Sequence, residues 1–154
     1  MFEPPRFTPT AIRFFAKFSR FEFAMKNIQQ YRRVKQTNGG VEPDWDNFAN
    51  FLFAKENRDE FFANLNNDAK TKYLLHSPPR KRLVNAHGQL DWSDPPLALQ
   101  DIREVCTMVR RVRNNLAHGD KAHPGAERNR KLLSAATTIL DRMLTDNVEL
   151  QHFF

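Results

Sequence analysis

The sequence predicts an all-α protein of a single domain, and three observations lead to this prediction. Apolar residues recur at three- and four-residue steps through several long stretches, as they do on one face of a helix. Glycine and proline clusters separate these stretches. The 154 residues are enough for one hydrophobic core and leave little room for a second. We therefore expect one helical bundle over residues 1–154, with a long first helix and two long C-terminal helices.

The first helix is expected from about Pro9 to Val34. Phe15 and Phe23 lie beside its apolar stripe and widen the apolar face, which indicates either a deeply buried helix or a subunit interface. For most of these aromatic residues taken singly, packing in the core is the favoured interpretation. The turn sequence at residues 38–40, NGG, is expected to end the helix. The stripe itself consists of Phe14, Phe18, Phe21, Met25 and Ile28.

The middle of the chain is expected to hold shorter helices and one irregular insertion. Pro43 and Asp44 precede a helix near Trp45–Ala54, and further helices are predicted near Arg58–Leu65 and Asp68–Leu75. Residues 77–96 carry four prolines and are predicted to be mostly loop. Their alternating pattern would allow a short strand pair, but two strands alone are marginally stable.

The two C-terminal helices have the clearest patterns. Asp94 is expected to cap the first of them, with Pro95 in its first turn and Gly119 after its end. The second is expected over Ala126–Leu150. The buried face of the first is predicted to be Leu99, Ile102, Val105, Cys106, Val109, Val112 and Leu116, and that of the second Leu132, Leu133, Ala136, Ile139, Leu140, Met143 and Leu144.

Composition narrows the class of protein. No apolar run approaches the length needed to span a bilayer, and Glu3, Pro4 and Pro5 stand where a signal peptide would be basic and then apolar. The single cysteine, Cys106, cannot form an internal disulfide and is expected to be a buried thiol. We therefore expect a cytoplasmic protein. Its net charge of +6 would favour contact with a polyanion, although many basic proteins bind no nucleic acid.

Three polar side chains at the end of the penultimate helix are the best candidates for chemistry. Arg113 offers a planar fork of donors that suits a phosphate, and Asn114 can donate or accept beside it. His118 can take or give a proton near neutral pH. Arg82 and His87 repeat the same spacing, but they lie in the proline-bounded insertion and no asparagine follows Arg82. The later pair is therefore preferred.

The segment VRRVRNNLAHG, residues 109–119, resembles the Arg-x4-6-His signature of the HEPN superfamily, in which a polar residue, often asparagine, follows the arginine. The phrase FFAKFSRFEFAMK, residues 14–26, resembles an aromatic-rich opening found in a plasmid and bacterial branch of that superfamily. The resemblance covers most of the chain in its order of helices. The specific motif is only about seven residues long, and residues 77–96 have no counterpart in it.

The resemblance implies an endoribonuclease that needs no metal or other cofactor. In such an enzyme the RNA 2′-hydroxyl attacks the neighbouring phosphate; His118 would move protons, Arg113 would stabilise charge and Asn114 would orient. Arg110, Arg111 and Lys121 would contact the RNA backbone, although they also fit an ordinary solvated face. A homodimer is implied too, and it follows independently because one motif offers one histidine whereas the reaction benefits from an acid and a base. Similar domains act as toxins or antiviral effectors, with an antitoxin or regulatory protein as partner.

Two alternatives stay open: a non-catalytic module that binds RNA or nucleotides, and a helical domain that binds a protein through its first helix. Glu22 is expected either to pair with Arg20 at the surface, the favoured interpretation, or to reach a basic site from the first helix. His76, His123 and His152 share no metal-ligand spacing with carboxylates or the cysteine. No glycine-rich phosphate loop is present either, so an enzyme that acts on nucleoside triphosphates is not expected.

Overall fold

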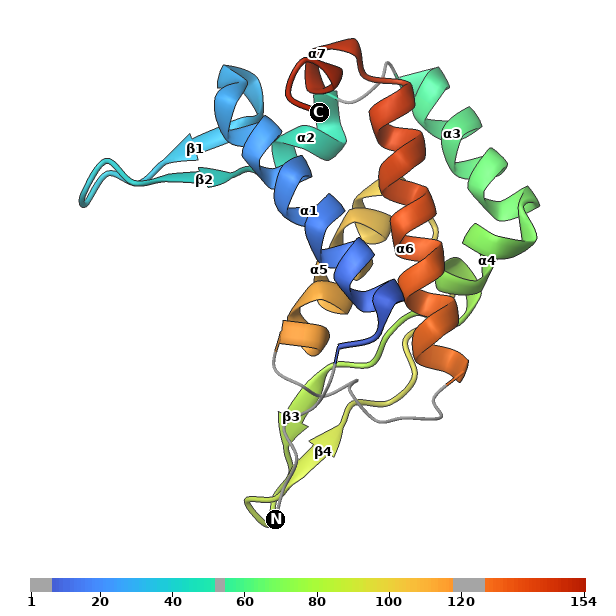
Figure 1. Ribbon diagram of the computed structural model, residues 1–154. Helices are drawn as coiled ribbons and strands as arrows, with labels where there is room; N and C mark the ends of the chain where they lie inside the picture. Colours follow the sequence, from blue (N-terminus) through green and yellow to red (C-terminus); the bar gives the residue numbers. More distant parts are fainter. Residues whose placement is uncertain (1–6, 52–54, 118–126) are drawn as a thin grey trace.

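Helices dominate the protein, as the sequence predicts. The computed structural model describes residues 7–51, 55–117 and 127–154, and within these ranges seven α-helices form a bundle from which two small hairpins project (Figure 1). Helix α6 packs against α1 and α4, while α5 packs against α2. None of the helices in the described ranges is both long and apolar enough to cross a membrane. The bounds are α1 Pro9–Asn27, α2 Trp45–Phe51, α3 Lys55–Asn67, α4 Ala69–His76, α5 Ile102–Ala117, α6 Glu127–Thr145 and α7 Val148–Gln151.

Helix α1 begins where the sequence predicts and ends earlier. The Thr8 hydroxyl accepts the Ala11 N–H, and Pro9 occupies the first helical position, where its missing donor costs nothing. The helix stops at Asn27 rather than Val34, so the predicted end is wrong. A 3₁₀ turn, Gln29–Tyr31, follows it, and Tyr31 is buried there. The next residues pair as strands, β1 Arg32–Val34 with β2 Val41–Pro43 in antiparallel register.

The apolar stripe of α1 forms one side of the core. Phe14, Phe18 and Phe21 are buried, as predicted, and Trp45 of α2 stacks on both Phe18 and Phe21. Phe23 is 54% exposed, so it belongs to the outer face of the helix. The predicted continuation of α2 to Ala54 lies outside the described residues, and α3 is longer at both ends than the predicted Arg58–Leu65.

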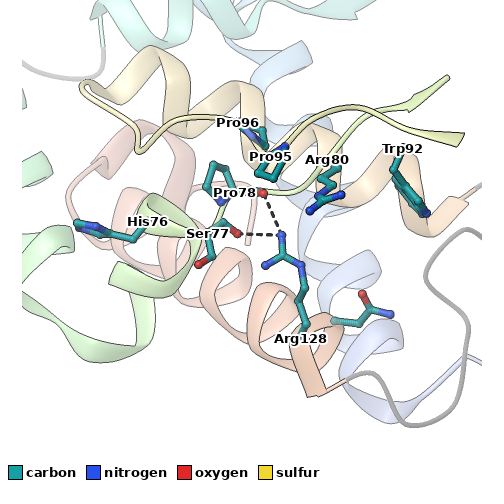
Figure 2. A pocket seen from close by; sticks show the side chains of 9 residues that line it. His76, Ser77, Pro78, Arg80, Trp92, Pro95, Pro96 and Arg128 are labelled. Atoms are coloured by element: carbon teal, nitrogen blue, oxygen red, sulfur yellow. Dashed lines mark hydrogen bonds between the residues drawn. The ribbon is translucent and has the colours of Figure 1, made fainter.

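The insertion at residues 77–96 is mostly loop, as predicted, and it contains the short strand pair that its alternating pattern allows. Strands β3 Arg82–Val84 and β4 Leu90–Trp92 are antiparallel, and Gly88 takes a positive φ of 74° in the turn between them. The preceding residues are fixed to α6, because the Arg128 guanidinium donates to the carbonyls of Ser77 and Pro78 (Figure 2).

Helix α5 begins at Ile102 rather than after Asp94. The Leu99 N–H donates to the Leu75 carbonyl at 2.9 Å, which holds the chain along the end of α4 and delays the helix. Asp101, not Asp94, takes the capping position, since its carboxylate accepts the Glu104 N–H. The predicted cap was therefore wrong, whereas the predicted buried face is confirmed. The predicted C-cap, Gly119, lies outside the described residues.

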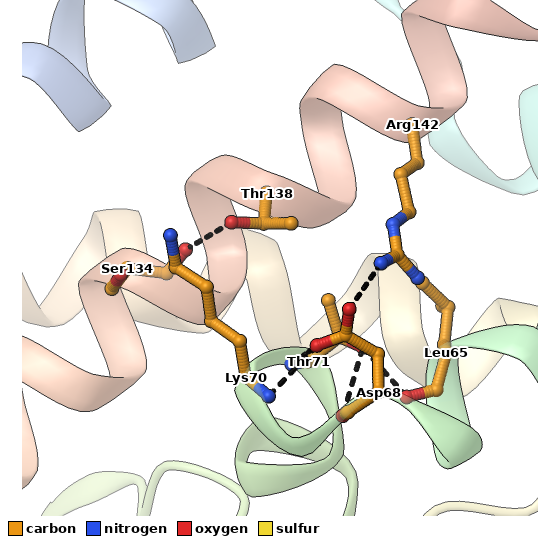
Figure 3. Close-up of polar contacts among 7 residues, drawn as sticks. All are labelled: Leu65, Asp68, Lys70, Thr71, Ser134, Thr138 and Arg142. Carbon is orange, nitrogen blue, oxygen red and sulfur yellow. Dashed lines mark hydrogen bonds and ion pairs between the residues drawn. The ribbon is translucent and has the colours of Figure 1, made fainter.

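A polar cluster joins α3, α4 and α6 (Figure 3). The Asp68 carboxylate accepts the N–H groups of Lys70 and Thr71 at the start of α4 and also pairs with Arg142 of α6. The Thr71 hydroxyl donates to the Leu65 carbonyl at 2.6 Å. These contacts hold the start of α4 against α3 and α6, and α4 leads directly into the 77–80 loop.

The last predicted helix is divided in two. Helix α6 ends at Thr145, and Asn147 caps the short α7 by accepting the Leu150 N–H. The buried Asn147 amide also donates to the Tyr31 hydroxyl at 3.1 Å. This single contact therefore lies beside both boundaries that the sequence pattern misplaced, the end of α1 and the end of α6.

Candidate active site

Arg113 lies near the C-terminal end of α5 and faces α1. Its guanidinium carbon is 5.2 Å from the centre of the Phe18 ring, and its Nη2 atom is 3.9 Å from Oε1 of Glu22. The side chain is 35% exposed, and its buried Nε has no hydrogen-bond partner among the described residues. Two side chains of α1 thus hold the guanidinium at the surface, and some of its N–H donors remain without a partner among the described residues.

Glu22 is itself held from a third helix. Its Oε1 atom accepts the indole N–H of Trp45 at 2.9 Å, and Trp45 stacks on Phe21 with ring centres 5.6 Å apart. Glu22 therefore reaches the basic motif from the first helix, the alternative that sequence reasoning ranked second. Arg20, the partner favoured from sequence, instead donates to the Phe154 carbonyl.

The other predicted site residues on α5 lie on different sides of the helix. Arg110 and Asn114 are exposed, one turn apart on the same face. Arg111 is partly buried and donates to the Pro79 carbonyl at 3.2 Å, and burial lowers the pKa of its guanidinium. The structure thus gives Arg111 a role in holding the loop. Contact of Arg110 or Arg111 with RNA stays a prediction.

Two predicted residues, His118 and Lys121, lie outside the described residues. The described part of the motif therefore runs from Arg113 to Ala117, the last residue of α5. Within it, Asn115 is buried and donates to the Arg80 carbonyl at 3.0 Å. Of the two adjacent asparagines, only Asn114 is exposed.

The competing pair, Arg82 and His87, occupies the β3–β4 hairpin. The Arg82 guanidinium carbon lies 4.6 Å from the centre of the Trp92 ring on the partner strand. His87 is exposed in the turn, where its N–H donates to the Asn85 side chain. This placement gives Arg82 a packing role within the hairpin.

Sequence reasoning missed a pocket of about 530 Å³ beside the 77–80 loop. Arg80 and Arg128 both line it, together with residues of the insertion and none of α1 or α5. The sequence did carry one sign of it, the basic run Arg80, Lys81 and Arg82 directly after two prolines. Nothing in the sequence linked that run to Arg128.

Comparisons with protein-family models, with curated proteins and with solved structures found no match to this chain. The relation to the HEPN superfamily therefore rests on the residues of the motif and of the first helix, and it enters the conclusions below as a proposal.

Proposed function

We propose that this protein is a metal-independent endoribonuclease of the HEPN type that acts as a homodimer. One observation carries the proposal: α1 fixes the guanidinium of Arg113 at the surface, through Phe18 and Glu22, near the helix end that precedes His118 in the sequence. An arginine held in this way needs no reorganisation to meet a negatively charged phosphate.

The proposed reaction is an internal transfer within RNA. The 2′-oxygen bonds to the neighbouring phosphorus, and the bond from phosphorus to the 5′-oxygen breaks, which leaves a 2′,3′-cyclic phosphate and a 5′-hydroxyl. One His118 accepts the proton of the 2′-hydroxyl, and the second, from the other copy, gives a proton to the departing 5′-oxygen. Arg113 stabilises the charge that develops on the phosphate, and Asn114 orients it.

The outer face of α1 supports the dimer. Ile12 is 58% exposed and Phe23 is 54% exposed, and helical geometry places both on the side of α1 next to Glu22. Two copies joined through this face would bring their Arg113 side chains towards one groove. We therefore propose this face, rather than the buried aromatic stripe, as the dimer contact.

The biological role follows from the resemblance alone. We propose a cytoplasmic toxin or antiviral effector that an antitoxin or another regulatory protein restrains. A second candidate function, a non-catalytic module that binds RNA or nucleotides, draws support from the basic pocket beside the 77–80 loop. The two candidates differ in whether loss of Arg113 or His118 abolishes turnover while binding persists.

The test is RNA cleavage in excess EDTA, with identification of the product ends. Wild type should yield cyclic-phosphate ends, and both Arg113→Ala and His118→Ala should lose them. His87→Ala is the matched control, because it removes the histidine of the competing pair and should cleave normally. If a well-folded, dimeric wild type cleaves no RNA, the non-catalytic module becomes the better account.

A further inference from the structure

The 530 Å³ pocket lies where three segments meet: the loop after α4, the chain between β4 and α5, and the first turn of α6 (Figure 2). Its walls include two arginines, one histidine, one tryptophan and adjacent prolines, and no carboxylate is among its nine lining residues. The two arginines are Arg80 and Arg128, and two of the prolines are Pro95 and Pro96.

The wall formed by residues 77–80 is fixed by side chains from two helices. Arg128 of α6 donates to the carbonyls of Ser77 and Pro78, at 3.3 and 3.0 Å. Arg111 and Asn115 of α5 donate to the next two carbonyls, those of Pro79 and Arg80. Four successive carbonyls thus have side-chain donors, so the pocket is formed before any ligand arrives.

This pocket is separate from the Arg113 site. Arg111 and Asn115, one turn apart on α5, both point to the pocket wall, whereas Arg113 lies about 160° around the helix from each of them. Arg113 accordingly contacts α1. Helix α5 therefore stands between the two sites.

The charges in the pocket favour an anion. Arg80 is exposed, and its side chain has no hydrogen-bond or ion-pair partner among the described residues. In Figure 2 the guanidinium groups of Arg80 and Arg128 point into the same space between the loop and α6. Two positive charges with no carboxylate in the lining attract a phosphate. Arg80 can bind it through paired hydrogen bonds, and Arg128, whose Nη2 donates to two carbonyls, keeps the N–H groups of Nη1 and Nε for it.

We propose that the pocket binds a nucleoside monophosphate unit. Its phosphate lies between Arg80 and Arg128, and its sugar and base lie against Pro95 and Pro96. The volume lies within the range of about 300–1,000 Å³ that is usual for small-ligand sites. The unit can be a free nucleotide or one residue of a single strand of nucleic acid. This proposal goes beyond cleavage, because binding here needs neither Arg113 nor His118.

The experiment is isothermal titration calorimetry of the full chain with adenosine and uridine 5′-monophosphates, inorganic phosphate, and a 2′-deoxy hexanucleotide that cannot be cleaved through a 2′-hydroxyl. Arg80→Gln should weaken nucleotide binding about tenfold, since it removes a charged hydrogen-bond donor. Arg130→Gln is the matched control, because it makes the same charge change on exposed α6 surface outside this pocket, and it should bind within about twofold of wild type.

Three results would overturn the proposal: no binding of any nucleotide or of the hexanucleotide, equal weakening by Arg80→Gln and Arg130→Gln, or inorganic phosphate bound as tightly as the nucleotides. If the hexanucleotide binds more tightly than the mononucleotides, the proposal is supported and the natural ligand is a single strand of nucleic acid. If the affinities are equal, the proposal is supported and the natural ligand is a free nucleotide. None of these ligands is cleaved through a 2′-hydroxyl, so the titrations measure binding alone and can be interpreted even if the nuclease proposal fails.

Discussion

The two sides of α5 use similar side chains in different ways. On one side, Arg113 is held by an aromatic ring and a carboxylate of α1, and its guanidinium stays one-third exposed. On the other side, Arg111 and Asn115 each donate a hydrogen bond to a backbone carbonyl, that of Pro79 and that of Arg80. On α5, the side chains that donate to backbone carbonyls hold the loop in place, whereas Arg113, held beside a carboxylate and a ring, can still meet a ligand. The comparison teaches that position around the helix, rather than residue type, separates a candidate site residue from a structural one.

The largest effect that we predict on stability concerns Cys106, which lies on the Arg113 side of α5, two turns before it. The thiol is buried as the sequence predicts, and burial raises its pKa to about 12. The folded state therefore holds the proton more tightly than the unfolded state, whose thiol pKa is about 8.5. The buried, protonated thiol therefore contributes fully to the unfolding free energy below about pH 8.5, and this contribution is lost as the pH rises towards 12.

We expect wild type to lose about 2 kcal/mol of unfolding free energy between pH 7 and pH 10 beyond any loss in Cys106→Ala. Urea denaturation of both proteins at the two pH values measures this difference. Parallel pH profiles for the two proteins would mean that the thiol is exposed to water, which would contradict the burial of Cys106 described above.

The next effect tests Glu22 as the residue that positions Arg113. Glu22→Gln keeps an acceptor for the Trp45 indole and removes the charge beside the guanidinium. If the protein cleaves RNA as proposed, kcat should fall about tenfold with KM nearly unchanged, because misplacement of a catalytic group lowers the rate more than binding. Steady-state cleavage assays give both constants.

Glu149→Gln is the control for Glu22→Gln, because it removes an exposed carboxylate whose acceptor contact is with Gln30. It should leave kcat unchanged, and Glu22→Asp should recover part of the lost rate. A purely structural role for Glu22 would show instead as reduced thermal stability with an unchanged kcat for the folded fraction.

The smallest effect belongs to the opposite side of the helix. Arg111→Gln removes one donor to the Pro79 carbonyl and should lower the unfolding free energy by about 1 kcal/mol. Thermal unfolding measures the loss, with Arg110→Gln as the exposed control that should change stability little. A larger loss in the Arg110 variant would reverse the assignment of these neighbouring arginines.

The parts of the fold that sequence predicted are those decided by local periodicity. The stripe of Phe14, Phe18 and Phe21 and the buried faces of α5 and α6 follow from apolar residues at helical spacing. The misplaced ends depend on contacts between distant residues. Tyr31 meets Asn147 across 116 residues, and Leu99 bonds to Leu75, and no local pattern encodes either contact.

The same distinction applies to the candidate site. Arg113 and Asn114 could be singled out because their types and their position at a helix end suit phosphate chemistry. The partnership of Arg113 with Glu22 could be raised only as an alternative, because it depends on how α1 crosses α5. The pocket could not be predicted, since Arg80 and Arg128 come together only through the carbonyls of the 77–80 loop.

The most direct test of the account compares Arg113→Gln with Arg111→Gln in single-turnover cleavage of one RNA in excess EDTA. The two variants make the same change two residues apart on one helix, so they differ only in the side of α5 that they alter. We predict a loss of about 100-fold or more for Arg113→Gln and of less than about threefold for Arg111→Gln. Equal losses in the two variants, or full activity in Arg113→Gln, would contradict the claim that the α1 side of α5 carries the chemistry.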